Sequence, residues 1–482
     1  KNLNRLMLNE SDRLVPIPGF ELKIEEIFAN QKAYKSAVKY LDIPARKQYI
    51  KKFIVNILKH KADLEWALKQ DIQMHPVVAG FVELYGILND LKFLDEQLGL
   101  NLKQDHINDL HVDRKVHTIK EPKGNCLIIT PWYDPVHLPL LLIGVAVATG
   151  NTVMLNLSQY VPYSNNIIKQ VIDETFPQEW VVAFEGNRKI VEKLLTLDFD
   201  LVHFTGTRHK GLIIQQKVAT YAIPVALELR GRTAVFVDKH EHYGIIARKI
   251  IAAKFFKAGQ TSFAPDIVFV SAGEREALAR ELKLALEQMQ KDSQMYQQDF
   301  MKIANHKRFD KLFTMYHDAL QKGAVEICSG TVDRRHLYID PIILTGMHKD
   351  MSLMQEEIFG PLLPVMGYED VKEAFEALSE TPHLVNLCIF SGRQGFIDNI
   401  IGATTSRTVF INETPVYGMP HMKNVDGSDK PSCSASKIKK EIMLFTTQRD
   451  VLTSSGKYNT AADNRSDTQQ HIVDRLSKLF GA

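Results

Sequence analysis

The stretch CLIITPWYDPVHLPLLLIGVAVATGNTVMLNL, residues 126–157, contains the pattern from which the fold can be predicted. Its first five residues are an apolar run of strand length. Pro135–Thr149 is an apolar run of helix length, and Gly150 is a typical residue just past a helix end. Thr152–Leu157 is again strand-like. A strand, a helix and a second strand in this order predict a parallel strand pair joined by a crossover helix.

The same alternation continues along most of the chain. Because repeated units of this kind form parallel sheets with helices on both faces, we expect an α/β fold with ligands at the carboxyl ends of strands. The further strands are expected at Val181–Phe184, Leu201–Phe204, Ala234–Val237, Ile267–Val270, Tyr338–Leu344, Leu387–Phe390 and Thr408–Ile411. The further helices are expected within residues 22–70 and at Pro76–Gly99, Asn165–Thr175, Arg188–Leu195, Tyr243–Ala258, Glu274–Gln290 and Asp370–Leu378.

The end of the chain has a different composition. Tyr417–Ser436 is rich in Gly, Pro, Ser, Lys and Asp, which predicts a loop. Residues 454–470 are polar and linker-like. Ile472–Phe480 carries one apolar helical stripe, which predicts a terminal amphipathic helix that docks on its own domain or on a partner.

Composition and charge exclude several classes of protein. The 482 residues carry a formal net charge of +2, so bulk charge predicts no nucleic-acid partner. The four cysteines form no CxxC pair, so we predict neither a disulfide scaffold nor a metal site. The apolar run Pro135–Thr149 is shorter than the roughly 20 residues that span a bilayer. With no signal-peptide pattern in residues 1–20, a cytoplasmic protein without a transmembrane segment is expected.

The sequence lacks both common phosphate-binding fingerprints. No GxGxxG follows the first strand, and no GxxxxGK[ST] occurs anywhere. The remaining candidate is Phe204–Thr207 (FTGT) with Gly211, which follows a strand and opens a helix. Backbone N–H groups there are suited to a pyrophosphate, but a simple N-cap with a tight turn explains the same residues.

Five motifs occur in an order that points to one family. They are Pro131-Trp132, Phe204–Thr207, Glu228–Gly231 (ELRG), Gly259–Asp266 (GQTSFAPD) and Glu356–Pro361 (EEIFGP). Over residues 22–451 the chain thereby resembles the aldehyde dehydrogenase superfamily, most closely its class 3 or fatty-aldehyde type. The resemblance implies NAD(P)-dependent oxidation of aldehydes to acids. It also implies two parallel-sheet α/β domains and a bridging oligomerisation β-hairpin.

The resemblance also implies the domain boundaries. Residues 1–110 would be the helical part of the cofactor domain and residues 111–227 its Rossmann-like part, with a hairpin strand at 111–122. Residues 228–408 would form the catalytic domain and residues 409–453 the oligomerisation segment. A linker and the terminal helix would follow at 454–482.

The catalytic positions of the family are altered in this sequence. In the family a cysteine thiolate attacks the aldehyde, an Asn side chain holds the oxyanion, and a glutamate activates water. Here Ser262 stands at the nucleophile position and Tyr133 at the oxyanion position, whereas Glu228 retains the general-base position. Arg230 replaces a glycine next to the cofactor. Its cation is expected either to fill that space or to pair with Glu228, which would make the glutamate a poorer base.

The cofactor positions are partly retained. The Lys and Glu that hold the adenosine ribose in the family are replaced by Asn156 and Gln159. The retained cofactor-binding positions are Trp132, Ser158, Thr205, Gly206, Thr207, Glu357 and Phe359. NAD or NADP is therefore the expected cofactor, with binding weakened or absent.

Three hypotheses remain open. The first is an aldehyde dehydrogenase homologue that is impaired or inactive because Ser262 replaces the nucleophilic cysteine. The second is an active enzyme with altered chemistry, either a Ser262-based esterase or a slow dehydrogenase. The third is a structural or interaction subunit. The resemblance implies a homodimer, and a small aldehyde or acyl group is the expected ligand.

Overall fold

The computed structural model describes residues 20–102, 105–108, 114–239, 242–292, 300–379, 384–415, 432–454, 473, 474 and 477. The chain divides into two compact units. One consists of residues 1–101 and 122–446, and the other of residues 102–121 and 447–482. The larger unit contains a five-stranded and a seven-stranded sheet, and the smaller unit contains a three-stranded sheet.

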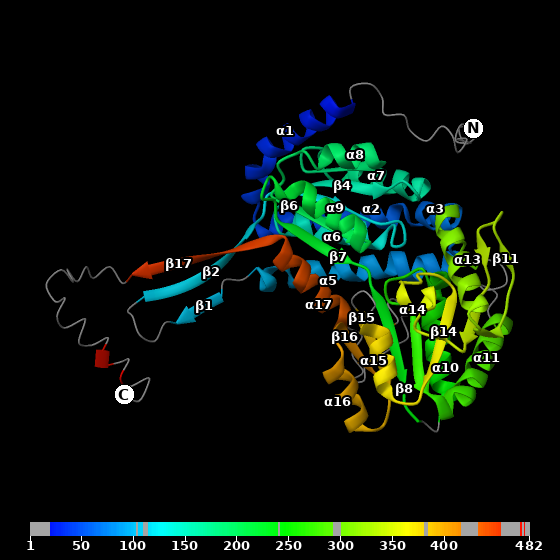
Figure 1. Cartoon of the computed structure of the whole chain (residues 1–482). Helices are drawn as coiled ribbons and strands as arrows, with labels where there is room; N and C mark the ends of the chain where they lie inside the picture. The colour runs from blue at the N-terminus through cyan, green and yellow to red at the C-terminus, as the bar shows by residue number, and fades with distance from the viewer. Residues whose placement is uncertain are drawn as a thin grey trace. The chain divides into compact units, whose positions relative to one another are not determined.

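The five-stranded sheet is parallel throughout, as predicted. Its strand order is β5-β4-β3-β6-β7, and helices cover both of its faces (Figure 1). The strands are β3 (Asn125–Ile129), β4 (Thr152–Ser158), β5 (Val181–Gly186), β6 (Leu201–Gly206) and β7 (Val225–Leu229). The helices between them are α6 (His137–Ala148), α7 (Pro162–Thr175), α8 (Arg188–Leu194) and α9 (Arg208–Ala219).

The apolar run after the first strand forms a central helix. Every residue of α6 from Leu138 to Ala148 is buried. The helix packs on β3 and β4 on one side and on α2 (Ile43–Lys59) and α5 (Gly86–Asn101) on the other, which explains why it is apolar on all sides. No helix among the described residues has the length and apolar character needed to cross a bilayer.

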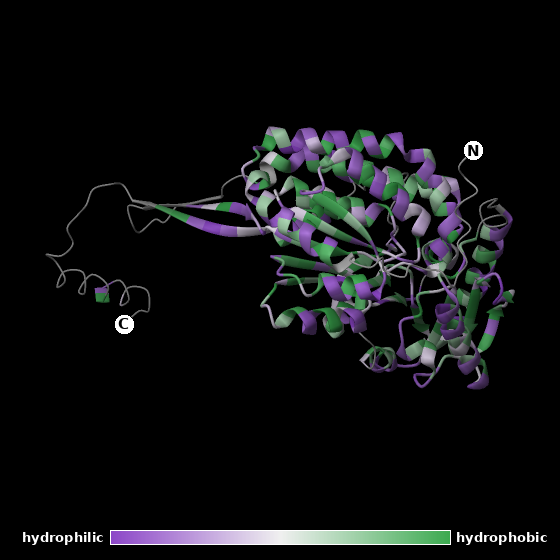
Figure 2. Cartoon of the chain, turned by 90° about the horizontal axis from the view of Figure 1, so that it is seen from above, coloured by the Kyte–Doolittle hydropathy of each residue, from purple (hydrophilic) through white to green (hydrophobic). Residues whose placement is uncertain are grey.

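The seven-stranded sheet has the order β10-β13-β14-β9-β8-β15-β16. All neighbouring strands are parallel except the edge strand β10, which is antiparallel to β13. In Figure 2 the strands inside the larger unit are mostly hydrophobic, whereas the surrounding helices alternate between hydrophobic and hydrophilic residues. The strands are β8 (Arg232–Val237), β9 (Ile267–Ser271), β10 (Val325–Cys328), β13 (Ile342–Thr345), β14 (Leu362–Tyr368), β15 (Leu384–Phe390) and β16 (Ser406–Ile411).

The helices that accompany the second sheet include two that agree with the predicted positions within a few residues. These are α11 (Arg275–Asp292) and α15 (Val371–Ser379). The helix α13 (His306–Gln321) was not predicted. The remaining helices of this half are α10 (Tyr243–Phe255), α14 (Ser352–Gln355) and α16 (Gln394–Ala403).

Three boundaries predicted from the sequence are wrong. The strand expected at Tyr338–Leu344 is two strands, β12 (Tyr338–Ile339) and β13, because Pro341 lies between them and has no N–H to donate. The β12 strand pairs with β11 (Val332–Asp333) instead of joining the large sheet. The other two concern helix ends. The helix expected to run to Ala258 ends at Phe255, and α17 (Ser432–Leu444) begins inside the stretch expected to be a loop.

The N-terminal region is helical, as predicted. Its helices are α1 (Phe20–Lys39), α2, α3 (Lys61–Ile72), α4 (Pro76–Val78) and α5, with a π-helical segment at Ala79–Tyr85. A π-helical turn re-aims side chains and often occurs beside functional sites. Here it places the fully buried Glu83 next to the loop that follows β3.

The smaller unit is a sheet of the order β1-β2-β17. It consists of β1 (Asp105–Asn108), β2 (Arg114–Pro122) and β17 (Thr446–Ser454), and β1 and β2 are antiparallel. The strand β2 lies in the segment predicted as a hairpin strand. Thr118 donates a hydrogen bond to Asp450 over 2.7 Å. The predicted terminal stripe Ile472–Phe480 lies outside the described residues, apart from 473, 474 and 477.

Candidate functional site

Arg230 lies at the centre of the site that the motifs form. It follows β7, the edge strand of the five-stranded sheet, and its N–H donates to the carbonyl of Gly206 over 2.9 Å. Its guanidinium carbon is 3.7 Å from the ring centroid of Phe359, and one of its nitrogens is 3.3 Å from a carboxylate oxygen of Glu357. From the sequence, this cation was expected either to fill the space beside the expected cofactor positions or to pair with Glu228. In the structure, the Arg230 side chain lies beside those positions, and its ion-pair partner is Glu357, not Glu228.

Two aromatic side chains, Tyr133 and Phe359, contact this arginine, and Trp132 packs on both of them. The ring centroid of Phe359 is 6.1 Å from that of Trp132 and 5.1 Å from that of Tyr133. Tyr133 is only 4% exposed, and this burial raises the pKa of its hydroxyl. The guanidinium carbon of Arg230 lies 5.6 Å from the Tyr133 ring centroid. Cation–π contacts therefore hold Arg230 against the residues at the expected oxyanion and nicotinamide positions.

The loop that carries Glu357 and Phe359 is anchored by a buried ion pair. Arg232, which is fully buried, pairs with Asp266 and donates to the carbonyl of Leu353 over 2.9 Å. Asp266 in turn accepts from the N–H of Ile358 over 2.9 Å. The Asp of the GQTSFAPD string and the EEIFGP string are thus joined directly, which gives both strings a structural role.

The nucleophile loop contacts the same anchored loop. Gly259 has a φ of +69°, and a Cβ there would lie 2.3 Å from the carbonyl oxygen of Gly360, so only glycine fits. The side chain of Gln260 is bonded to the backbone of residues 302 and 304 over 2.9 and 3.1 Å. Ser262 follows in a turn before β9 and is partly exposed.

The described cysteines do not replace the missing thiol. Cys126 and Cys388 are fully buried within strands β3 and β15, and burial raises the pKa of both thiols. Burial also raises the pKa of the partly buried Cys328. A raised pKa lowers the thiolate fraction at neutral pH. The side chain of Cys433 lies outside the described residues.

A buried lysine fixes the loop that follows β3. The Nζ atom of Lys257 lies 2.6 Å from Glu83, 3.1 Å from Asp134 and 3.2 Å from the carbonyl oxygen of Tyr133. Glu83 also accepts from the N–H of His137 at the start of α6, over 2.8 Å. Burial alone would raise the pKa of Asp134, but Lys257 and His137 bring it below its ordinary value. Lys257 thereby neutralises the negative charge that the sequence places beside the oxyanion position.

Glu228 lies on β7 in a strongly charged environment. Burial alone would raise the pKa of its carboxyl, but electrostatic interactions with Lys437 and His203 lower it below its ordinary value. A carboxylate with a lowered pKa is a weaker base. Glu228 occupies the family's general-base position in the sequence.

Two residues beside Glu228 were missed by the sequence analysis. His203 on β6 and Glu441 on α17 bring their ligating atoms and those of Glu228 within 4.8 Å of one another. A signal for each was present in the sequence. His203 interrupts an otherwise apolar strand, and Glu441 shares a helical stripe with Ile438 and Phe445, both of which are buried.

The residues expected on the adenosine and pyrophosphate side lie at the ends of β4 and β6 and at the start of α9. Thr207 caps α9 by accepting from the N–H of Lys210 over 3.5 Å, so it serves as an N-cap. Ser158 ends β4, and its hydroxyl accepts from the N–H of Tyr160 over 3.5 Å. The side-chain oxygens of Asn156 and Thr205 are buried and make no hydrogen bond within the described part of the chain.

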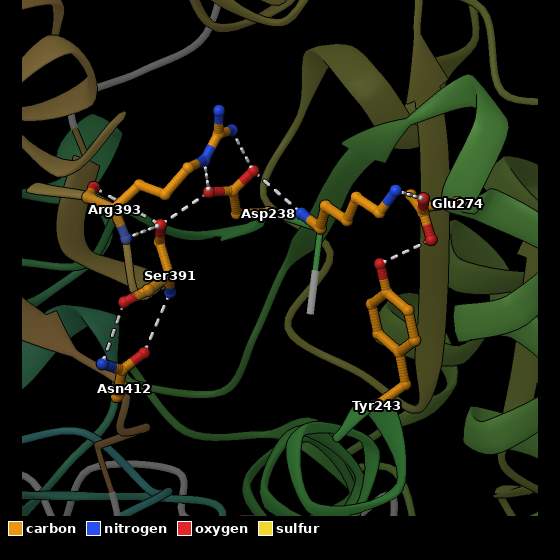
Figure 3. Close-up of polar contacts among 7 residues, drawn as sticks. Asp238, Tyr243, Glu274, Ser391, Arg393 and Asn412 are labelled. Carbon is orange, nitrogen blue, oxygen red and sulfur yellow. Dashed lines mark hydrogen bonds and ion pairs between the residues drawn. The ribbon is translucent and has the colours of Figure 1, made fainter. Parts of the chain in front are cut away.

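A second polar cluster lies at the carboxyl edge of the seven-stranded sheet (Figure 3). Asp238 follows β8 and accepts from the side chains of Ser391, over 2.6 Å, and Arg393, over 2.8 Å. Asn412 bonds to both backbone groups of Ser391 over 2.9 and 3.1 Å. Nearby, Tyr243 donates to Glu274 over 2.8 Å. These bonds join the ends of β8, β15 and β16 and give the cluster a structural role.

Known proteins match this chain along most of its length. The model of the aldehyde dehydrogenase family matches residues 21–451. The 4,4'-diaponeurosporen-aldehyde dehydrogenase of Staphylococcus aureus is 30% identical over 82% of this chain and 86% of its own length. The putative aldehyde dehydrogenase AldX of Bacillus subtilis is 29% identical over 82% of this chain and 89% of its own. The structure of the substrate-bound state of Staphylococcus aureus AldH superimposes with a TM-score of 0.84 at 27% identity, covering 95% of this chain and 99% of the other.

Proposed function

Because the chain belongs to the aldehyde dehydrogenase family, we propose that it retains the scaffold of an NAD(P)-dependent aldehyde dehydrogenase but is impaired or inactive as a dehydrogenase. The observation that carries this proposal is the position of Arg230. Its guanidinium stacks on Phe359 and pairs with Glu357, the two residues expected to contact the nicotinamide ribose. A dinucleotide must displace this side chain before its nicotinamide can reach them.

The nucleophile supports the same proposal. A serine hydroxyl is far less ionised than a thiol at neutral pH and needs an adjacent base. Ser262 provides a hydroxyl where the family provides a thiol. Among the described cysteines, Cys126 and Cys388 are buried, and burial raises the pKa of the partly buried Cys328. The nucleophilic step is therefore expected to be slow.

The oxyanion and general-base positions support it as well. The loss of one oxyanion donor costs roughly 10²–10³ in rate. At that position the ring of Tyr133 is packed against Phe359. Glu228 retains its place, but its pKa is lowered, so it activates water less well.

The two ends of the dinucleotide site differ in how well they fit a cofactor. At the adenosine end, the N-terminus of α9, which Thr207 caps, can receive anionic groups. At the nicotinamide end, Arg230 occupies the contacts. Structures of related fold have been solved with NADP and with NAD, which identifies the two cofactors to test. Binding of NAD or NADP is expected to be weak or absent.

The alternative of a serine-based esterase has less support. Such chemistry usually needs an imidazole positioned by a carboxylate. The histidine beside Glu228 is His203, which is fully buried and stacks on Phe445 with ring centroids 5.8 Å apart. Its ring is committed to this packing, so it is poorly placed to serve as the base of Ser262.

A homodimer and a cytoplasmic location remain predictions. The homodimer is supported by two edges in the structure. The strand β16 is an edge of the seven-stranded sheet and exposes Val409 and Ile411, and β17 is an edge of the three-stranded sheet. Exposed apolar edge strands commonly pair with another chain.

The proposal is tested by a turnover assay of the purified chain. Long-chain and aromatic aldehydes are offered with NAD and with NADP, and ester hydrolysis is measured in parallel for the native chain and for Ser262→Ala. We expect no dehydrogenase turnover in the ordinary range of the family and no difference between the two chains in ester hydrolysis. Ordinary turnover would refute the proposal. Ester hydrolysis that is lost in Ser262→Ala would favour the esterase.

A further inference from the structure

One imidazole and two carboxylates converge on one face of the five-stranded sheet. In the parallel register of β6 and β7, Thr205 lies opposite Glu228, and His203 precedes Thr205 by two residues. Because side chains alternate along a strand, His203 and Glu228 point to the same face. Helix α17, which also packs on α5 and α6, supplies Glu441, and the three sets of ligating atoms lie within 4.8 Å of one another.

These groups are buried without the bonds that normally accompany burial. His203 and Glu441 have no exposed surface. Neither ring nitrogen of His203 and neither carboxylate oxygen of Glu441 makes a hydrogen bond within the described part of the chain. Their closest approach, 3.2 Å between Nε2 and Oε2, is an ion-pair contact. Since a buried polar group without a partner is costly, the arrangement calls for a ligand that satisfies several of these atoms together.

We propose that His203, Glu228 and Glu441 form a binding site for one divalent transition-metal ion, best matched by zinc. Zinc is bound by imidazole nitrogen and carboxylate oxygen, and sites with three protein ligands leave a further position for water. Manganese and iron accept the same donor atoms. The stacking of His203 on Phe445, with an angle of 7° between the rings, holds the imidazole in place.

The charge around the site permits a dication. The two carboxylates bring two negative charges, and the partly buried Lys437 is a cation that interacts electrostatically with both of them. Lys440 and Arg407 add weaker positive potential at Glu228. Lys437 therefore competes with a metal for the same carboxylates. Removing its charge should strengthen metal binding, whereas a purely structural ion-pair network would be weakened by the same change.

The inference does not depend on the proposed function, because its readout is metal binding and not turnover. The full chain is treated with EDTA, dialysed and titrated with ZnCl₂ by calorimetry, and the bound metal is counted by mass spectrometry after gel filtration. We expect one zinc per chain. His203→Gln and Glu441→Gln should each weaken binding by at least about tenfold. Lys437→Met should tighten it.

The matched control is His336→Gln. His336 and Asp333 are an exposed histidine–carboxylate pair, 2.6 Å apart, so this variant tests for adventitious surface binding. We expect its zinc affinity to equal that of the native chain. Failure of the native chain to bind zinc, or equal losses in His336→Gln and Glu441→Gln, would overturn the proposal. Should the buried variants fail to fold, the native titration and the sign of the Lys437→Met effect still decide it.

Discussion

A polar cluster lies at the carboxyl edge of each of the two large sheets, and the two clusters differ in how completely their polar atoms are hydrogen-bonded. At the edge of the seven-stranded sheet, the carboxylate of Asp238 is saturated by bonds from Ser391, Arg393 and the N–H of Lys239. At the edge of the five-stranded sheet, atoms of Thr205, Arg230 and several neighbours are buried without hydrogen bonds in the described part of the chain. The first cluster is complete without a ligand, and the second is not.

This difference separates structural polar groups from functional ones. A saturated cluster contributes to folding stability and has nothing left to offer a ligand. A cluster with unpaired buried atoms gives up stability and is retained where a ligand completes it. Substitutions at the two edges should therefore have different consequences, and the following predictions are ordered by the size of the expected effect.

The largest effect should come from restoring the family residues at the incomplete edge. In the variant Ser262→Cys, Tyr133→Asn, Arg230→Gly, we expect aldehyde-dependent formation of reduced nicotinamide to rise by at least roughly 10²–10³, because the oxyanion donor alone accounts for that range. The rate is followed by the absorbance of the reduced cofactor. The matched control carries Ala at position 262 with the other two changes. A native chain as active as the triple variant would contradict the prediction.

The next largest effect should be a decrease in the free energy of unfolding, and we expect it for substitutions at the edge of the seven-stranded sheet. Asp238→Ala leaves the buried hydroxyl of Ser391 without its acceptor and removes a charge-assisted bond to Arg393, so we expect the free energy of unfolding to fall by about 2–3 kcal/mol. Glu441→Gln, measured in metal-free protein, should change it by less than Asp238→Ala does, because Glu441 makes an ion-pair contact with His203 at 3.2 Å but no hydrogen bond within the described residues. Urea unfolding followed by circular dichroism gives both values. The reverse ranking would remove the distinction between the edges.

A smaller effect should appear in the pH dependence of stability. Burial alone would raise the pKa of Asp238, but its bonds to Arg393 and Ser391 lower it below the value of an unfolded chain. A carboxyl of this kind stabilises the fold above its unfolded pKa of about 3.9, and this contribution is lost as the pH falls through the folded pKa. The difference in urea midpoint between pH 7 and pH 3 should therefore be smaller in Asp238→Asn than in the native chain. Equal differences would show that Asp238 is not a source of acid sensitivity.

The fold was largely predictable because it depends on local patterns. The apolar runs around α6 and the short strands identify the parallel sheets, and the EEIFGP and GQTSFAPD strings identify the family. The errors arose where one residue overrides a pattern. Pro341 divides a predicted strand, and the left-handed backbone of Lys257 and Ala258, with φ of 49° and 53°, follows the early end of α10.

The site was predictable only in part, because its charge partners are distant in sequence. The sequence shows that Arg230 replaces a glycine, but its pairing with Glu357 depends on the anchored loop before β14. In the same way, His203 and Glu441 are separated by 238 positions in the sequence (441 − 203). They meet only when α17 packs beside the five-stranded sheet. Motifs identify the residues that match those of a family. Residues that join a site from distant parts of the sequence can be identified only from the folded structure.

The central claim is that Arg230 blocks the nicotinamide end of the cofactor site, and the most direct test is calorimetric titration of NAD and NADP into the native chain and into Arg230→Gly. The account predicts weak or undetectable binding to the native chain and at least tenfold tighter binding to the variant, equivalent to about 1.4 kcal/mol. Arg393→Gly, at the complete edge, serves as the control and should leave binding unchanged. Tight binding of either dinucleotide by the native chain, unaltered in Arg230→Gly, would contradict the account.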